Sequence, residues 1–204
     1  MNKMQEISLN ILDVVENSVR ADAGKVGILI VDDEDEGTLT VTISDDGRGM
    51  TAEETERAVD PFYTTRRSRR VGFGLPLLKE AAELTGGEMR IESGPGSGTC
   101  LTAVFDKHHL DCPPLGDIVA TLKTLIVGYP GVDFHYEHHV GRERVVLDTE
   151  ELSREYGKGF RKDVHAVCSA LDSLDSLLAH FRDGETYFKS VLSRRKSAGE
   201  RSYG

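Results

Sequence analysis

The alternation of apolar and polar positions predicts the elements in the first half of the chain. Residues 4–21 have apolar side chains at helical spacing, namely Ile7, Ile11, Val14, Val15 and Val19. Strict alternation over residues 39–44 predicts a half-buried strand, joined by an acidic turn to an earlier strand over 25–31. Residues 88–93 and 99–105 predict a second hairpin across a glycine-rich turn. Periods of 3.6 and two residues in this order predict a sheet packed against helices.

Boundary signals place two more helices in this half. Thr51 is followed three residues later by Glu54, the arrangement of a capping box, so a short helix is expected to begin there. A helical period over residues 75–84 closes at Gly86, a typical helix C-terminus. Between them, residues 61–70 lack an apolar period and carry four arginines. A glycine-containing loop before the second helix would point backbone N–H groups at an anion such as phosphate.

From residue 108 the pattern predicts a smaller α+β unit. Its expected elements are a helix over 115–127, a hairpin of strands 132–139 and 144–147, a short helix starting near Thr149, and a long helix over 160–181. The sequence after residue 193 is basic and is expected to be a flexible tail.

Composition and charge narrow the class of protein. The net charge is −10. Residues 1–105 carry 11 Lys and Arg against 19 Asp and Glu (−8), and residues 106–204 carry 14 against 16 (−2). This acidity argues against general nucleic-acid binding. No apolar run approaches the roughly 20 residues of a membrane span. The three cysteines are far apart, so a cytoplasmic protein without a disulfide framework is expected.

Two polar patterns interrupt the predicted elements. Asp45-Asp46-Gly47-Arg48-Gly49 directly follows a strand, which places a carboxylate beside backbone that carries no Cβ. Acidic glycine turns also end many strands for geometric reasons, so this motif is weak alone. On the first helix Asp13, Asn17 and Arg20 lie at i, i+4 and i+7, on one face. They form either solvated surface or part of a site.

Together these motifs make the chain resemble the Bergerat-fold (GHKL) ATPases: gyrase B subunits, heat-shock chaperones, mismatch-repair ATPases, histidine kinases and anti-sigma-factor kinases. Four kinds of motif match in order, an N box at 13–20, a glycine box at 45–49, a phenylalanine box at 61–66 and later glycine boxes at 72–75 and 98–99. The resemblance implies an α+β fold, a two-layer sandwich in which helices cover one face of a mixed sheet, with a smaller C-terminal appendage. The lid motif is most similar to those of histidine-kinase-like and anti-sigma-factor-kinase-like domains.

The resemblance also implies a role for each matching residue around bound ATP. Asn17 is expected to ligate Mg²⁺, since a neutral oxygen suits a hard cation, and Arg20 to reach phosphate oxygens. Asp45 is expected to accept a hydrogen bond from the adenine amine. Gly47 and Gly49 are expected to let the backbone pass beside the base.

The lid and the catalytic position complete the implied site. Gly72 and Gly74 are expected to bring N–H groups to the phosphates, and Thr99 to support the adenine end through its hydroxyl. Asp13 is the candidate for polarising a lytic water. Hydrolytic members of the family carry Glu at that position, and Asp is one methylene shorter, so the water would have to sit closer.

Three functions stay open at this point. The enzyme is expected to act by slow ATP hydrolysis or by phosphoryl transfer to Ser, Thr or His of a partner protein, in signalling or regulation. The alternative is a non-catalytic ATP-gated protein-binding switch with little turnover. The expected domains are a histidine-kinase-like ATPase domain (1–107), an α+β appendage (108–158) that contacts a protein partner, and a C-terminal helix with its tail (159–204). Neither nucleic acid nor membrane is expected as a partner, and a homodimer stays open.

Histidines in the appendage have two interpretations. His135, Glu137 and His139 alternate along one predicted strand, with His138 beside them. They are either metal ligands or, the interpretation we prefer, an exposed polar strand face. His165 lacks the acidic neighbour and the following proline of a phospho-accepting histidine box, so a self-contained sensor histidine kinase is not expected.

Overall fold

The structure is a computed structural model that describes residues 6–60, 74–157 and 159–182. The predicted phenylalanine box, Gly72 and the arginine-rich segment before it lie outside the described residues. The basic C-terminal segment also lies outside them.

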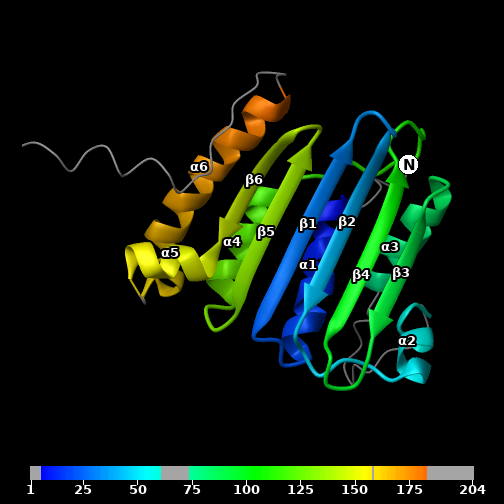
Figure 1. Ribbon diagram of the computed structural model, residues 1–204, viewed down its shortest axis with the longest axis horizontal. Coiled ribbons are helices and arrows are strands. Elements are labelled where there is room, and N and C mark those ends of the chain that lie inside the picture. The colour runs from blue at the N-terminus through cyan, green and yellow to red at the C-terminus, as the bar shows by residue number, and fades with distance from the viewer. Residues whose placement is uncertain (1–5, 61–73, 158, 183–204) are drawn as a thin grey trace, which may run out of the picture.

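One mixed sheet of six strands forms the centre of the molecule (Figure 1). The strands are β1 (Lys25–Asp33), β2 (Thr38–Asp45), β3 (Glu88–Ser93), β4 (Thr99–Asp106), β5 (Asp133–Val140) and β6 (Glu143–Asp148). Their order in the sheet is β3-β4-β2-β1-β5-β6. The pair β1 and β5 is parallel, and the other neighbours are antiparallel. The mixed sheet that the resemblance implied is therefore confirmed.

Helices form a second layer on one face of this sheet, and none of the described helices covers the opposite face, which we call the open face. The helices are α1 (Ile7–Arg20), α2 (Ala52–Ala58), α3 (Gly74–Leu84), α4 (Ile118–Gly128), α5 (Thr149–Tyr156) and α6 (Val164–Arg182), with the 3-10 turn η1 (Phe160–Lys162). In Figure 1, α1, α3 and α4 lie behind the sheet. Contacts of α1 with α3 and α4, and of α4 with α6, join these helices into one layer. The predicted two-layer α/β sandwich is confirmed.

No helix in the described parts of the chain combines the length and the apolar character needed to cross a bilayer.

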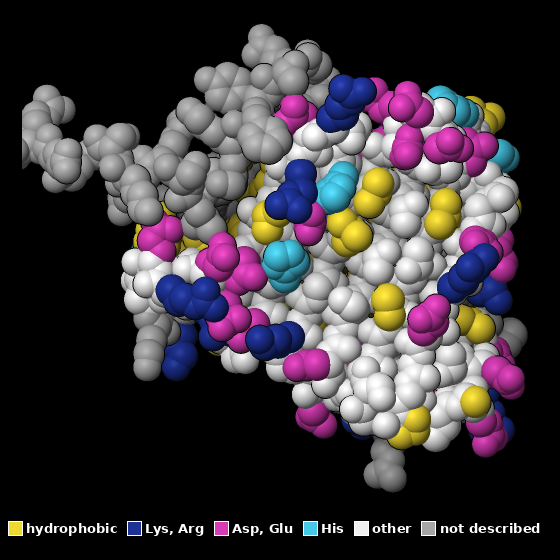
Figure 2. Space-filling model, viewed as in Figure 1, with side chains coloured by type: hydrophobic (Ala, Val, Ile, Leu, Met, Phe, Trp, Pro, Cys, Tyr) yellow, Lys and Arg dark blue, Asp and Glu magenta, His cyan; other side chains and the backbone are white. Residues whose placement is uncertain are grey.

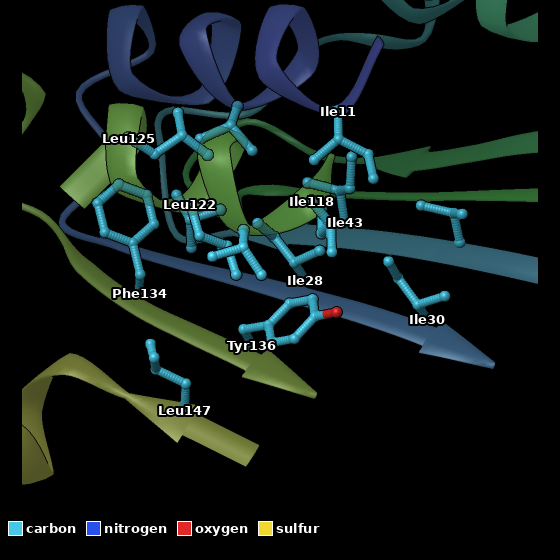
Figure 3. Close-up of a cluster of buried hydrophobic side chains, with 14 of the residues drawn as sticks. Ile11, Ile28, Ile30, Ile43, Ile118, Leu122, Leu125, Phe134, Tyr136 and Leu147 are labelled. Atoms are coloured by element: carbon cyan, nitrogen blue, oxygen red, sulfur yellow. The ribbon is translucent and has the colours of Figure 1, made fainter. Parts of the chain in front are cut away.

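Alternate strand residues face the helices and make one core across the whole sheet. Ile28 and Ile43 are 1% and 2% exposed, and Phe134 and Tyr136 of β5 are 1% and 0% exposed (Figure 3). Burying one such side chain contributes about 1.5–3 kcal/mol. Sheet and core thus continue past residue 107, and the domain boundary expected there stays a prediction.

The segment between β4 and α4 is hydrogen-bonded to the start of α1. The Ile7 N–H donates to the Pro114 carbonyl at 3.0 Å, and the Ser8 N–H donates to the Leu115 carbonyl at 2.8 Å. Helix α1 has no side-chain cap at Glu6. Because the first N–H groups of a helix lack intrahelical partners, these two carbonyls replace the missing cap.

The long helix predicted over 160–181 is corrected to a 3-10 turn followed by α6. The break falls at Asp163, whose backbone is extended. Its Oδ1 accepts the N–H groups of His165 and Ala166 at 3.0 and 3.1 Å. Asp163 is therefore an N-cap, which ends one element and starts the next.

The short helix predicted to start near Thr149 is present as α5 (Thr149–Tyr156). The N-cap is Asp148, whose Oδ1 accepts the N–H groups of Glu150 and Glu151 at 2.8 and 3.0 Å. Thr149 is fully buried, and its hydroxyl accepts the Phe134 N–H at 2.8 Å. It therefore ties α5 to β5 and does not cap the helix.

Candidate functional site

A cavity of about 230 Å³ opens beside the C-terminal half of α1 and the ends of β2 and β4. Its apolar lining includes Val14, Ile43, Leu75, Ile91 and Leu101. Its polar lining includes Asn17, Arg20, Asp45 and Thr99, four of the residues predicted to bind nucleotide. An apolar cavity with a few convergent polar groups is the usual form of a cofactor or substrate site.

Strand register creates the polar part of this cavity. Asp45 of β2 pairs with Thr99 of β4, and Thr99 pairs with Ser93 of β3. We call Ser93, Thr99 and Asp45 the polar row. Ile43 and Leu101, two residues away along their strands, are 2% and 1% exposed in the core. Because side chains alternate with a period of two, the polar row lies on the same face as the core.

The Asp45 carboxylate is held by two donors from different elements. Its Oδ2 accepts the Ser18 hydroxyl at 2.6 Å, and its Oδ1 accepts the Gly47 N–H at 2.9 Å. Ser18 is 5% exposed on α1. An ionised carboxylate offers only acceptors, so Asp45 can receive further hydrogen bonds from a ligand but cannot donate one. The motif comparison did not single out Ser18, although it directly follows Asn17.

Glycines allow the turn after Asp45 to interlock with the β3–β4 turn. Gly49 has φ +67°, and a Cβ there would stand 1.9 Å from the Gly94 carbonyl oxygen. Gly98 has φ +74°, and a Cβ there would stand 1.9 Å from the Asp45 carbonyl oxygen. Gly49 lines the cavity, whereas Gly47 is not among the described lining residues. These contacts give the glycine motif a structural role beside its predicted one near the base.

Asn17, Arg20 and Glu16 form a small network at the mouth of the cavity. Arg20 Nη1 donates to Asn17 Oδ1 at 2.9 Å, and Arg20 also forms an ion pair with Glu16. Amide and carboxylate oxygens are the ligands that Mg²⁺ prefers, so this donor set fits the predicted metal position. The guanidinium beside them suits phosphate oxygens.

Asp13 lies one turn before Asn17 and is not among the described residues of the cavity lining. It packs against Gly74, the first residue of α3, where a Cβ would stand 2.6 Å from Asp13 Cβ. A helix N-terminus favours a nearby negative charge, so this position also gives the carboxylate a structural role. Gly74 is needed here for close approach of α3 to α1.

Ser93 does not line the cavity, but it connects its own strand, β3, to Met50 and to the adjacent residues Gly98 and Thr99. Its Oγ lies 2.9 Å from the Met50 backbone N, from the Gly98 carbonyl oxygen and from Thr99 Oγ1. Sequence motifs did not identify Ser93, because its role depends on pairing with Thr99 across the hairpin.

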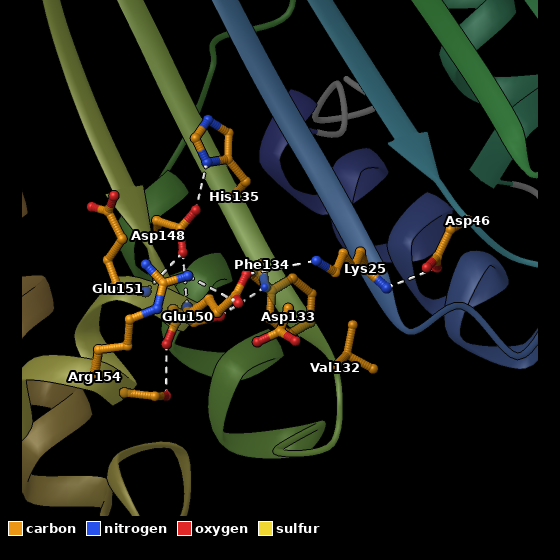
Figure 4. Close-up of polar contacts among 12 residues, drawn as sticks. Lys25, Asp46, Val132, Asp133, Phe134, His135, Asp148, Glu150, Glu151 and Arg154 are labelled. Carbon is orange, nitrogen blue, oxygen red and sulfur yellow. Dashed lines mark hydrogen bonds and ion pairs between the residues drawn. The ribbon is translucent and has the colours of Figure 1, made fainter. Parts of the chain in front are cut away.

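A second polar group lies on the open face, over β5 and β6 (Figure 2). We call His135, Glu137, His139, Arg144 and Asp148 the open-face cluster. His135 Nδ1 lies 3.0 Å from Asp148 Oδ2 (Figure 4). Glu137 Oε1 lies 2.6 Å from His139 Nε2 and 3.2 Å from Arg144 Nη1. The carboxylates of this cluster therefore already have cationic or hydrogen-bonding neighbours.

These contacts lower the pKa values of both carboxyl groups. Partial burial raises the pKa of Glu137, but the hydrogen bond and charge of His139, with Arg144, outweigh it, so the net pKa is lowered. Partial burial likewise raises the pKa of Asp148, and the hydrogen bonds from His135 and the α5 backbone reverse the shift. Both groups thus favour the ionised state.

The four histidine and glutamate candidates for metal binding are split between the two faces. His138 is 6% exposed on the core face, with Nδ1 2.9 Å from the Tyr136 hydroxyl. His135, Glu137 and His139 face the other side, as their predicted alternation requires. Within residues 6–60, 74–157 and 159–182, no group of three or more His, Cys, Asp or Glu side chains is arranged to hold a metal ion.

Residues 4–109 match the sequence family described as histidine kinase-, DNA gyrase B- and HSP90-like ATPase. The sensor histidine kinase ZraS of Klebsiella oxytoca is 32% identical over 94 residues, covering 45% of this chain and 20% of that protein. An uncharacterized sensor-like histidine kinase of Rhizobium meliloti (strain 1021) is 31% identical over 170 residues, covering 76% and 30%. The chain therefore spans less than a third of the length of either relative.

Among solved structures, the N-terminal domain of a DNA repair protein superposes with a TM-score of 0.53 at 14% identity. The similarity covers 76% of this chain and 57% of that one. It concerns the fold alone, and it extends beyond the length of the family match.

Proposed function

The chain belongs to the family of histidine kinase-, DNA gyrase B- and HSP90-like ATPases, and on this premise we propose that its cavity binds ATP with Mg²⁺ for phosphate chemistry in signalling. The chemistry is slow hydrolysis or transfer of the γ-phosphate to a Ser, Thr or His side chain of a partner protein. The appendage is the proposed contact for that partner.

One observation carries the nucleotide assignment, the Asp45 carboxylate at the edge of an apolar cavity. Ser18 and Gly47 fix its two oxygens, at 2.6 and 2.9 Å from their donors. Ile43, Ile91 and Leu101 line the same cavity, where they would pack against the flat faces of a base. The adenine amine would then donate to a carboxylate that is already oriented, at little cost in conformational entropy.

The phosphate end of the nucleotide is assigned to the mouth of the cavity. Asn17 would hold Mg²⁺ through its amide oxygen, and Arg20 would contact phosphate oxygens beside it. Bound Mg²⁺ would neutralise phosphate charge there. Arg20 is about half exposed, so it is free to leave Asn17 for a ligand without losing a buried contact.

A second candidate function is an ATP-gated protein-binding switch with little turnover. The position of Asp13 supports it, because that carboxylate packs against Gly74 at the start of α3 and is not among the described lining residues. Hydrolysis needs a base within hydrogen-bonding reach of the attacking water. In the hydrolytic version, Asp13 must therefore reach the cavity from this position.

The experiment that tests the proposal uses γ-labelled ATP with the purified protein, alone and with cell lysate. Free labelled phosphate supports hydrolysis, and label on a second protein supports transfer. Intact ATP that is bound and protects the protein from hydrogen exchange supports the switch. Absence of ATP binding by calorimetry, with or without Mg²⁺, would overturn all three.

A further inference from the structure

We infer that Asn10 weakens the packing of α3 against α1, so that the first half of α3 moves away from the cavity and returns while the rest of the protein stays folded. Asn10 is not among the described residues of the cavity lining, so it acts through α3. The movement itself needs no ligand, and its consequence for ATP rests on the proposed function.

Asn10 is a polar residue enclosed in the helix layer. It is 1% exposed, and its Oδ1 has no hydrogen-bond partner in the parts of the chain that the structure describes. A buried amide oxygen without a hydrogen bond raises the free energy of the packed state, because it has lost the water that would otherwise bind it. Any movement that exposes Asn10 to water removes this cost. The amide therefore favours an opened position of whichever element covers it.

Helical spacing places Asn10 on the side of α1 that faces α3. Asp13, one turn later on α1, packs against Gly74 at the start of α3. The two helices are antiparallel, since α3 ends beside the end of β4 and α1 begins beside the segment that follows β4. Asn10 therefore lies opposite the second turn of α3, which contains Leu78, and movement of that turn exposes the amide.

The C-terminal end of α3 is fixed to the sheet. Just after the helix, the buried Thr85 hydroxyl donates to the Ala82 carbonyl at 2.8 Å and accepts the Asp106 N–H at 3.2 Å. Gly87 packs so closely on β4 that a Cβ there would stand 1.9 Å from the Val104 carbonyl oxygen. This end of α3 is therefore the pivot of the inferred movement.

The N-terminal half of α3 buries little apolar surface. The buried residues of the helix are Gly74, Pro76, Leu78 and Ala82, and only Leu78 among them has a large side chain. Gly74 allows close approach to Asp13 but buries no side chain of its own. Segments with few buried apolar contacts open locally, before the whole protein unfolds. The unpaired amide of Asn10 lowers the free energy needed for this opening further.

Movement of this end of α3 would open the cavity. Leu75, in the first turn of α3, lines the cavity together with Asn17 and Asp45. A ligand can enter and leave when this wall moves out, and it is retained when the wall is packed against α1. Because Asn10 changes the populations of the two positions, it sets how often the cavity opens.

Hydrogen exchange in Asn10→Leu tests the inference. Leucine has nearly the same shape as asparagine and no polar atom, so this variant removes the unpaired oxygen and keeps the packing. In the wild type, amides in the first half of α3 should be less protected than those of β1 and β2. In Asn10→Leu these α3 amides should exchange about tenfold more slowly. Asn10→Met repeats the test with a second apolar side chain.

Ser8→Ala is the matched control. Ser8 is also 1% exposed on α1, but two helical positions separate it from Asn10, so it lies on a different side of the helix. The control should leave exchange in α3 unchanged. The inference would be overturned if α3 were as protected as the sheet in the wild type. It would also be overturned if α3 kept its wild-type exchange rates in Asn10→Leu.

Stopped-flow binding of a fluorescent ATP analogue with Mg²⁺ tests the consequence for the cavity. Asn10→Leu should slow binding and release by similar factors and leave the Kd nearly unchanged, because the packed position is stabilised in the free and the bound protein alike. A changed Kd with unchanged rates of release would contradict control of cavity opening by Asn10. A wild type that binds no nucleotide would overturn the proposed function, while the hydrogen-exchange result would still decide the inference about α3.

Discussion

The polar row and the open-face cluster lie on opposite faces of one sheet, and both arise from the same strand alternation. In the open-face cluster, Glu137 and Asp148 contact histidine or arginine, so their charges are compensated within the protein. In the polar row, Asp45 contacts a hydroxyl and an N–H and borders an apolar cavity. The open-face cluster has more charged groups, but the polar row has hydrogen-bond acceptors that border the cavity proposed to bind a ligand.

The difference shows that the number of polar groups does not identify a site. Strand alternation determines which face of the sheet a polar residue lies on. Helices enclose the residue only if it lies on the covered face. On the covered face, a polar group at the end of a strand meets an apolar wall and low dielectric, where each hydrogen bond matters more. On the open face, charged groups pair with each other and with water, and such pairs contribute little.

Substituting one of the interlocked glycines should disrupt the polar row more than any other change. Gly98→Ala should lower the free energy of unfolding by about 3 kcal/mol or more, because its Cβ would stand 1.9 Å from the Asp45 carbonyl oxygen at φ +74°. Gly96→Ala is the matched control, since Gly96 has φ +77° with open space around it. The control should lose only about 1 kcal/mol. Urea unfolding measures both, and equal losses would contradict the close packing.

Substitutions of two neighbouring carboxylates, Asp45 and Asp46, should separate a ligand contact from a structural one. Asp45→Ala should weaken ATP binding by about 1–3 kcal/mol, because it leaves the adenine amine unpaired in a desolvated cavity. Asp46→Ala should leave ATP affinity unchanged and reduce stability by about 1 kcal/mol, since Asp46 accepts the N–H groups of Gly24 and Lys25. Calorimetry distinguishes the variants, and wild-type affinity in Asp45→Ala would remove its predicted role.

The Mg²⁺ dependence of triphosphate binding tests the roles proposed for residues at the mouth of the cavity. Asn17→Ala should abolish the Mg²⁺ dependence of triphosphate binding and weaken binding in Mg²⁺ by about tenfold. Titrations with and without Mg²⁺ should then give the same Kd in the variant. A variant that still gains affinity from Mg²⁺ as the wild type does would show that another group holds the ion.

The open-face cluster should give the smallest effect, and it should concern stability alone. The pKa of Glu137 is lowered on folding, so its stabilisation is present at neutral pH and is lost as the pH falls through the folded-state value, below about 4.3. Glu137→Gln should therefore cost about 0.5–1 kcal/mol at pH 7 and nothing in strong acid. Urea unfolding at several pH values checks this, and a change in ATP affinity would contradict the separation of the faces.

Local sequence signals predicted the local structure well. The capping box at Thr51 is confirmed, with Thr51 accepting the Glu54 N–H at 3.2 Å and Glu54 accepting the Thr51 N–H at 2.8 Å. Both predicted hairpins in the first half are present. These features depend on residues within a few positions of each other, so propensity and spacing carry the information.

What the sequence left out depends on contacts between distant segments. The bond from Ser18 to Asp45 spans 27 residues, and Ser93 acts through register with Thr99. The parallel pairing of β5 with β1 likewise joins segments about a hundred residues apart, and no local period encodes it. The correction at Asp163 has a different cause, since one polar residue can cap a helix as well as continue its polar face.

The first turn of α1 is completed by backbone carbonyls that lie beyond the family match. The family match ends at residue 109, whereas the carbonyls that complete the first turn of α1 belong to Pro114 and Leu115. A segment that ended where the family match ends would lack these two acceptors. It would still contain α1, the helix that carries Asn17 and Ser18 near its C-terminus. The residues that complete the helix beside the cavity therefore extend beyond the region of the family match.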